Sequence, residues 1–86
     1  MFSLQIKRKA LRYVEKLDQT RKNLIKETLL LLKEDPVPAK AFDVTKLKGY
    51  DNVYRIRIGD LGIVYQVMWI ERIIVIAYIG PREKAY

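Results

Sequence analysis

The chain has 86 residues and a mass of 10.2 kDa, which predicts a single domain, residues 1–86, with a thin hydrophobic core. It contains no cysteine, which excludes a disulfide framework, a thiolate zinc site and a thiol nucleophile. It contains no histidine, which excludes histidine metal ligands and every histidine-containing catalytic triad. The sequence also has no metal-binding spacing and no Gly-rich phosphate loop, so we expect no metal or other cofactor.

The charge balance is strongly basic. Seventeen Lys and Arg residues against ten Asp and Glu residues give a formal net charge of +7 and a pI of about 9.8. Such an excess on a small body favours polyanions or acidic proteins as partners. The longest apolar run, residues 73–79, is too short to span a bilayer, and the N-terminus lacks the pattern of a signal peptide. We expect a cytoplasmic protein with no membrane contact.

The first half of the chain predicts one strand and two helices. Apolar and polar residues alternate over residues 2–6, which indicates a short strand. Apolar residues fall at helical spacing over residues 9–17. Either Asp18 or Thr20 can cap a second helix that runs to about Glu34, where a Pro-Val-Pro segment ends it. The two helices should form a hairpin.

The second half changes to a period of two, which is typical of strands. Residues 44–47, 53–58, 61–68 and 73–79 predict four strands that are joined by short turns. The complete order is β-α-α-β-β-β-β. It predicts an α+β fold in which a curved antiparallel sheet carries the helical hairpin on one face and leaves the other at least partly open.

Two arginines stand out in the strand at residues 53–58. Successive strand residues point to opposite faces, so Arg55 and Arg57 share one face and the apolar Tyr54, Ile56 and Ile58 share the other. Two guanidinium groups side by side suit an anion between them, and a phosphate accepts bidentate arginine contacts well. The alternative is a solvated polar face that pairs with acidic residues across the strands.

Further basic and aromatic residues can join this face. Arg82 follows the last strand directly and can swing over it, and Tyr86 could stack on a single-stranded RNA base. The alternative for this segment is an ordinary frayed terminus. Lys46 and Lys48 have the spacing of the two arginines and could add an RNA-binding rim, or they could simply be solvated.

Several segments together resemble a known family. The chain is similar to the RelE toxins of the RelE/ParE superfamily in FDVTKLKG at 42–49, VYRIRIGD at 53–60, IVYQV at 63–67, GPR at 80–82 and the final Tyr86. The Pro-Val-Pro loop at 36–38 resembles that of archaeal members. The resemblance covers the whole chain, and the order of elements in this family agrees with the order predicted above.

The resemblance implies the toxin of a type II toxin–antitoxin pair, with a small RelB-like antitoxin as its partner. Such toxins enter the ribosomal A site and cut the bound mRNA without a metal. The ribose 2′-hydroxyl attacks the adjacent phosphate, which leaves a 2′,3′-cyclic phosphate and a free 5′-hydroxyl. The catalytic positions of the family correspond to Arg55, Arg57, Arg82 and Tyr86 of this chain. Because arginine hardly ever loses its proton, the strand pair is expected to orient the phosphate and stabilise the transition state.

The chain departs from the family pattern at Gly62, where an arginine usually precedes the IVY run. Losing one contact to the transition-state phosphate would lower the cleavage rate by about 10²–10³. An attenuated toxin is therefore one expectation from the sequence. Two other functions remain open at this point: a non-enzymatic ParE-like toxin that inhibits gyrase, and a plain basic RNA-binding domain.

Overall fold

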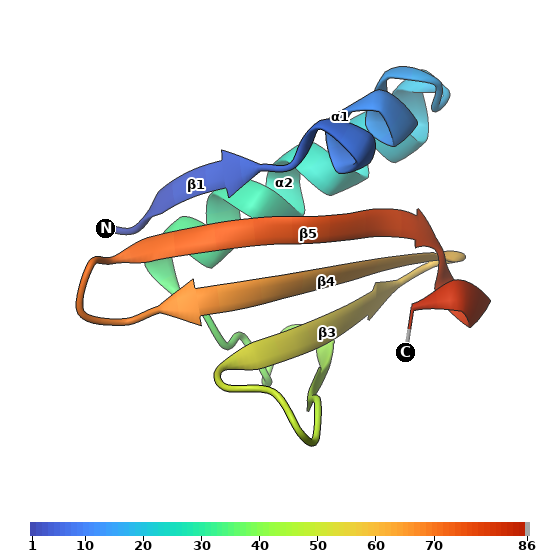
Figure 1. The fold of residues 1–86 in the computed structure, drawn as a ribbon. Helices are drawn as coiled ribbons and strands as arrows, with labels where there is room; N and C mark the ends of the chain where they lie inside the picture. The colour runs from blue at the N-terminus through green and yellow to red at the C-terminus, as the bar shows by residue number, and fades with distance from the viewer. Residues whose placement is uncertain (86) are drawn as a thin grey trace.

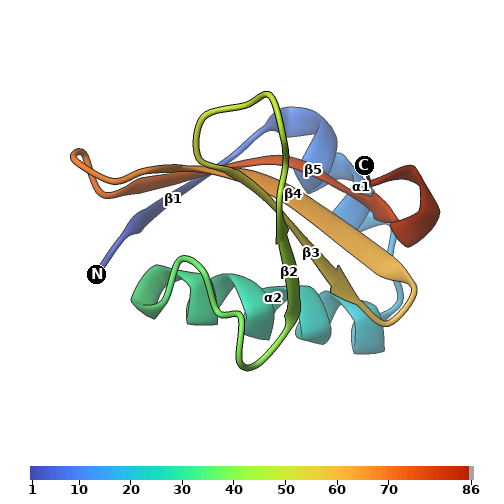
Figure 2. The same ribbon diagram turned by 90° about the horizontal axis from the view of Figure 1, so that it is seen from below.

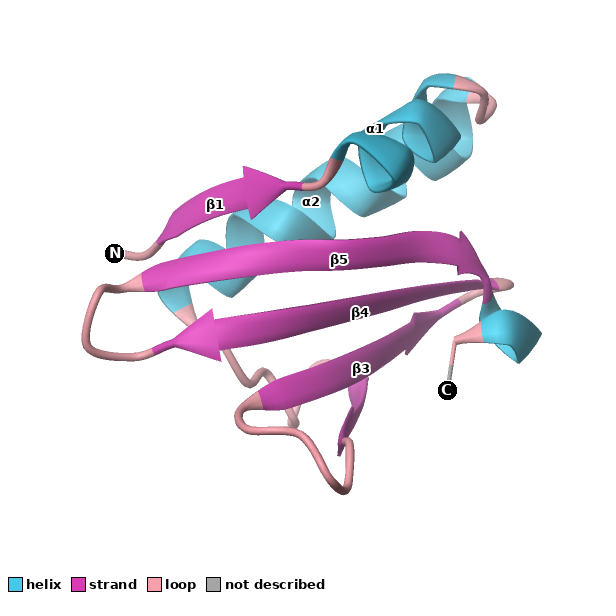
Figure 3. Ribbon diagram, viewed as in Figure 1, coloured by secondary structure: helices cyan, strands magenta, loops and turns pink. Residues whose placement is uncertain are grey.

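A computed structural model describes residues 1–85 of the chain (Figure 1). It contains two α-helices, five strands and one short 3-10 helix, which Figure 3 distinguishes by colour. The elements are β1 (Ser3–Ile6), α1 (Arg8–Glu15), α2 (Gln19–Glu34), β2 (Asp43–Lys46), β3 (Val53–Ile58), β4 (Leu61–Met68), β5 (Ile73–Pro81) and η1 (Arg82–Lys84). Among residues 1–85, no helix is long and apolar enough to cross a membrane.

The strands form one sheet in the order β1-β5-β4-β3-β2. The predicted α+β class and element order are confirmed, and strands β2 to β5 form the expected antiparallel meander. The edge strand β1 is the exception, because it pairs parallel with β5. Tight turns impose antiparallel pairing on consecutive strands. The two helices carry the chain from β1 to the opposite edge, so no such turn constrains β1.

The main core lies between the helices and one face of the sheet. Figure 2 shows α2 running beneath the curved sheet, as predicted for the helical hairpin. The side chains that fill this layer are almost fully buried and come from both sides; they include Ile25, Leu29, Leu32, Ile56, Ile63 and Ile76. Burial of this apolar surface, at roughly 25 cal/mol per Å², holds the two layers together.

One polar residue sits inside this core. Thr28 lies in the buried stripe of α2, and only 1% of its surface is exposed. Its hydroxyl donates a hydrogen bond of 2.8 Å to the carbonyl of Leu24, one turn earlier. Because the backbone of its own helix satisfies the hydroxyl, threonine can replace an aliphatic residue there at little cost.

A buried tyrosine ties the proline loop to the sheet. The hydroxyl of Tyr65 in β4 donates a hydrogen bond of 2.8 Å to the carbonyl of Pro36, and the ring stacks on Tyr54 at a centroid distance of 5.8 Å. Burial raises the pKa of Tyr65, so this hydroxyl remains a donor at all ordinary pH values. The loop after α2 is thereby fixed against the middle of the sheet.

Replacing Tyr65 with phenylalanine should lower the free energy of unfolding by about 1–2 kcal/mol, because the buried carbonyl of Pro36 loses its donor. Urea denaturation measures the change. Tyr54→Phe is the matched control, since it removes a hydroxyl from the stacked, half-buried neighbouring ring. Equal stability of the Tyr65→Phe variant and the original chain would show that this bond does not hold the loop.

Candidate active site

The register of the sheet places Arg55 and Arg57 on the face opposite the helices. Arg55 pairs with Thr45 and Val64, and Arg57 pairs with Asp43 and Gly62. We call this surface the open face. Both arginines are half-buried, whereas Ile56 and Ile58 point into the core. The predicted division of this strand into a basic and an apolar side is confirmed.

The two guanidinium groups are only partly satisfied. Nη1 of Arg55 donates to the carbonyl of Ala85 at 3.3 Å, and Nη1 of Arg57 lies 4.0 Å from a carboxylate oxygen of Asp43. The Nε atoms of both arginines are buried and have no hydrogen-bond partner among residues 1–85. A buried donor without an acceptor costs roughly 1–3 kcal/mol. The pair is therefore suited to an additional acceptor, such as a phosphate oxygen.

The end of the chain folds back onto the open face. After β5, η1 turns beside the ends of β3 and β4, as Figure 1 shows. The amide of Arg82 donates to the carbonyl of Asp60 at 2.9 Å, and the hydroxyl of Tyr78 donates to that of Pro81 at 3.2 Å. Ala85 is buried with 4% of its surface exposed. Residues 82–85 are thus an ordered part of the site.

Gly62 makes this arrangement possible. A Cβ atom at this position would lie 2.6 Å from the Cβ of Ala85 and 3.4 Å from the Cα of Arg82. Real Cβ atoms do not approach another carbon so closely, so any side chain at position 62 would push the C-terminal segment away from the sheet. The glycine that departs from the family pattern therefore has a structural role in this chain.

The C-terminal segment forms one side of an open hollow of about 400 Å³ at this end of the sheet. We call it the arginine hollow; its lining residues are Arg57, Gly59, Asp60, Arg82 and Glu83. Nη1 of Arg82 donates to the carbonyl of Gly59 at 3.4 Å, a long bond and the one side-chain hydrogen bond that Arg82 forms with residues 1–85. The structure therefore brings Arg57 and Arg82 together in one hollow, as the sequence predicted. Arg55 lies beside it, under the C-terminal segment.

An ion-pair network fixes the turn that forms one wall of this hollow. Asp60 accepts two hydrogen bonds from Arg21 of α2, at 3.1 and 2.6 Å, and Arg21 also binds Asp18 at 2.8 Å. The hydrogen bonds from Arg21 hold the pKa of Asp60 below its usual value. Asp60 is therefore a charged residue that is already paired with a cation outside the hollow.

The remaining predicted residues lie elsewhere. Lys46 pairs directly with Tyr54, so its side chain leaves the sheet on the helix side, away from the two arginines. Lys48 is exposed in the turn between β2 and β3. Their part in RNA binding stays a prediction, and the register does not favour it for Lys46. Tyr86 lies outside the described residues.

Sequence reasoning missed two features of the site. Glu83 of η1 lines the hollow together with Arg57, and the sequence offered only its position next to Arg82 as a signal. The pairing of Arg21 with Asp60 joins residues that are 39 positions apart in the chain, which no local pattern reveals.

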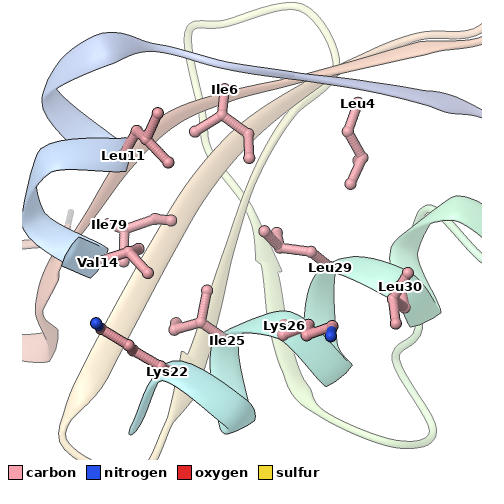
Figure 4. A pocket seen from close by; sticks show the side chains of 10 residues that line it. All are labelled: Leu4, Ile6, Leu11, Val14, Lys22, Ile25, Lys26, Leu29, Leu30 and Ile79. Carbon is pink, nitrogen blue, oxygen red and sulfur yellow. The ribbon is translucent and has the colours of Figure 1, made fainter. Parts of the chain in front are cut away.

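A second surface lies on the opposite side of the molecule. An apolar groove of about 250 Å³ opens between the helices and the edge strand β1 (Figure 4). We call it the helix groove; its lining residues are Leu4, Ile6, Leu11, Val14, Lys22, Ile25, Lys26, Leu29, Leu30 and Ile79. Leu11 and Leu30 are 46% and 52% exposed, which is unusual for leucines that line one groove.

These features define a small α+β protein that presents two arginines in one hollow and an apolar groove behind it. The family described as "ParE toxin of type II toxin-antitoxin system, parDE" matches residues 4–86, and the chain belongs to this family of the RelE/ParE superfamily. The resemblance seen in the sequence is confirmed.

Individual relatives agree with this assignment. A protein of Methanocaldococcus jannaschii, named as a candidate RelE1 toxin, is 40% identical over 85 residues, covering 99% of this chain and 94% of the relative. A chain of the archaeal RelE–RelB complex from Pyrococcus horikoshii OT3 is 30% identical with a TM-score of 0.87, over 98% of both chains. The intact Escherichia coli RelBE toxin–antitoxin complex contains the same fold, at 24% identity and a TM-score of 0.80 over 98% of this chain and 100% of that one. The chain is a RelE-type toxin of a toxin–antitoxin system.

Replacing Gly62 with alanine should displace the C-terminal segment and lower the free energy of unfolding by about 1–3 kcal/mol, because the new methyl group overlaps that of Ala85. Faster hydrogen exchange of the Arg82 amide, which is bonded to Asp60, would report the displacement. The double variant Gly62→Ala with Ala85→Gly keeps one methyl group at this contact instead of two. It should therefore recover much of the lost free energy of unfolding. If Gly62→Ala leaves both measurements unchanged, the segment does not rest on Gly62.

Proposed function

We propose that this toxin cuts mRNA in the ribosomal A site through attack of a ribose 2′-hydroxyl on the adjacent phosphate. The observation that carries the proposal is the convergence of Arg57 and Arg82 on one open hollow. Arg55 lies beside it, and its buried Nε atom has no partner among residues 1–85. Guanidinium groups bind phosphate oxygens through paired, charge-assisted hydrogen bonds. A net charge of +7 also favours association with an RNA-rich particle.

In this proposal the arginines act on the charge that develops at phosphorus. Attack by the 2′-oxygen places an extra negative charge on the phosphate oxygens, and donors held in position beforehand stabilise that charge most strongly. Arg57 is held by the sheet, and Arg82 is held at its amide by Asp60. Such positioning needs neither a metal ion nor histidine. The products are a 2′,3′-cyclic phosphate and a 5′-hydroxyl end.

The weak activity expected from Gly62 stays a prediction, and its test needs care. The partner of Gly62 across the strands is Arg57, so an arginine at 62 would stand beside Arg57 on the open face. It would also displace Ala85, and with it the segment that holds Arg82. Introducing arginine at position 62 would therefore add one cation while disturbing another.

Single-turnover cleavage should fall by about 10²–10³ in Arg57→Ala and in Arg82→Ala, because each loses one stabilising contact to the transition state. Primer extension on translated mRNA measures the cut. Arg12→Ala removes the same charge from an exposed position on α1 and should cut normally. A 2′-deoxy nucleotide at the cleavage position should block the reaction. Intact mRNA after incubation with the unaltered chain would refute the proposal.

Gyrase inhibition is the second candidate function, because the matching family is that of ParE toxins. A supercoiling assay with purified gyrase separates the two. Inhibited supercoiling with intact mRNA would favour this candidate, whereas the arginine hollow favours RNA cleavage. Salt-dependent RNA binding without either activity would leave a plain RNA-binding role.

We further propose that a RelB-like antitoxin places an amphipathic helix in the helix groove. The structures of related RelE toxins from Pyrococcus horikoshii and Methanococcus jannaschii are complexes with RelB, which supports an antitoxin partner for this chain. The groove is apolar and carries Lys22 and Lys26 along its wall. An antitoxin helix with leucine-type anchors and flanking acidic residues would match both its apolar floor and its charge.

Leu30→Asp should weaken binding of the RelB-like antitoxin by about 10–100-fold, since it places an unpaired charge in the apolar interface. Isothermal titration calorimetry measures the affinity. Leu31→Asp is the matched control, because Leu31 is 42% exposed on the same helix and is not among the residues that line the groove. If both variants weaken antitoxin binding equally, or if neither weakens it, the antitoxin binds outside the helix groove.

A further inference from the structure

Cleavage through a 2′-hydroxyl requires a group that accepts the hydroxyl proton, and the arginines cannot do so. A guanidinium group stays protonated under all ordinary conditions, and the chain has no histidine. Among residues 1–85, we therefore look for the base in the remaining lining of the arginine hollow. This step rests on the proposed function, because it concerns the chemistry of the same site.

Among residues 1–85, two carboxylates line the hollow, and Asp60 is the one of them that is paired with a cation. Asp60 is bound by two hydrogen bonds from Arg21, at 3.1 and 2.6 Å, and is held outward by α2. Glu83 is exposed and forms no ion pair with any of residues 1–85. It occupies the second position of η1, directly after Arg82, and lines the same hollow as Arg57.

We propose that Glu83 is the general base of the reaction. Its carboxylate accepts the proton of the 2′-hydroxyl while the 2′-oxygen forms a bond to phosphorus. The bond between phosphorus and the 5′-oxygen then breaks, and the departing oxygen takes a proton from a water molecule. The resulting hydroxide recovers the proton from Glu83. Atoms and charges balance, and no metal or redox partner takes part.

The neighbouring charges suit this role. A carboxylate facing an RNA phosphate would normally be repelled, but Arg57 and Arg82 line the same hollow and supply two positive charges. The same pair then binds the phosphate that the 2′-oxygen attacks as Glu83 takes its proton. A general base in position typically contributes 10²–10⁴ to the rate. Glu83 is thus the residue that lets a site built from arginines carry out acid–base chemistry.

The fold keeps Glu83 in place through contacts made by its neighbours. The amide of Arg82 is bonded to Asp60 at 2.9 Å, and the amide of Ala85 is bonded to the carbonyl of Arg82 at 3.2 Å. Ala85 itself packs on Gly62. The close contact at Gly62 therefore orients the short helix that carries the proposed base.

The test compares Glu83→Gln with Glu71→Gln in single-turnover cleavage of mRNA on the ribosome. Glu71 is an exposed glutamate in the turn between β4 and β5, so both changes remove one negative charge. We expect Glu83→Gln to cut about 10²–10³ times more slowly than the unaltered chain. Binding to the ribosome should be unchanged or tighter in both variants, and Glu71→Gln should cut normally.

Chemical rescue separates a base from a residue that merely supports the fold. Glu83→Ala opens a space that formate can enter, so added formate should restore part of the lost rate, whereas Arg82→Ala should gain nothing from it. Normal cutting by Glu83→Gln, alongside an inactive Arg82→Ala, would overturn the base assignment and leave the proposed function intact. Loss of activity without rescue by formate would also overturn it, in favour of a structural role. Failure of the unaltered chain to cut mRNA would overturn both proposals.

Discussion

The candidate site depends on one close contact, in which Ala85 rests on the bare backbone of Gly62. The contact is apolar and small, yet it determines where the chain goes after its last strand. Because the segment lies flat on the sheet, Arg82 and Glu83 reach the hollow that Arg57 lines. A side chain at position 62 would separate the two halves of the site. Gly62 lacks the positive charge that an arginine would supply at this position, but it allows residues 82–85 to pack on the sheet.

Apolar packing, not electrostatics, keeps such a site stable before its ligand arrives. Arg55 and Arg57 are neighbours of like charge, and each has a buried Nε donor without an acceptor among the described residues. The carbonyl of Ala85 and the carboxylate of Asp43 compensate only part of this cost. The apolar side of β3, buried under α2, anchors the strand and holds the arginines in this unfavourable arrangement. An anion that binds here supplies the missing acceptors, so its binding relieves this unfavourable arrangement.

The two faces of the sheet serve different partners in our proposals. The open face carries the charges and suits RNA, whereas the helix groove behind it is apolar and suits a protein helix. The parallel pairing of β1 with β5 contributes to this separation, because it brings Leu4 and Ile6 to the edge of the groove. The same small core thus supports both surfaces.

Much of this organisation follows from local sequence patterns. The alternation in Val53–Ile58 determined which residues face the core and which face outward, because side chains in a strand point alternately to the two faces. Helical spacing, the cap at Asp18 and the prolines determined the helical hairpin. Strand alternation and chain position singled out the three arginines, and the resemblance identified the family. Only the tertiary structure decided the parallel edge strand, the direction of Lys46, the pairing of Arg21 with Asp60 and the position of Glu83. These features join residues that are distant in the chain or lie beyond its last strand, so they depend on packing between elements, which no local period encodes.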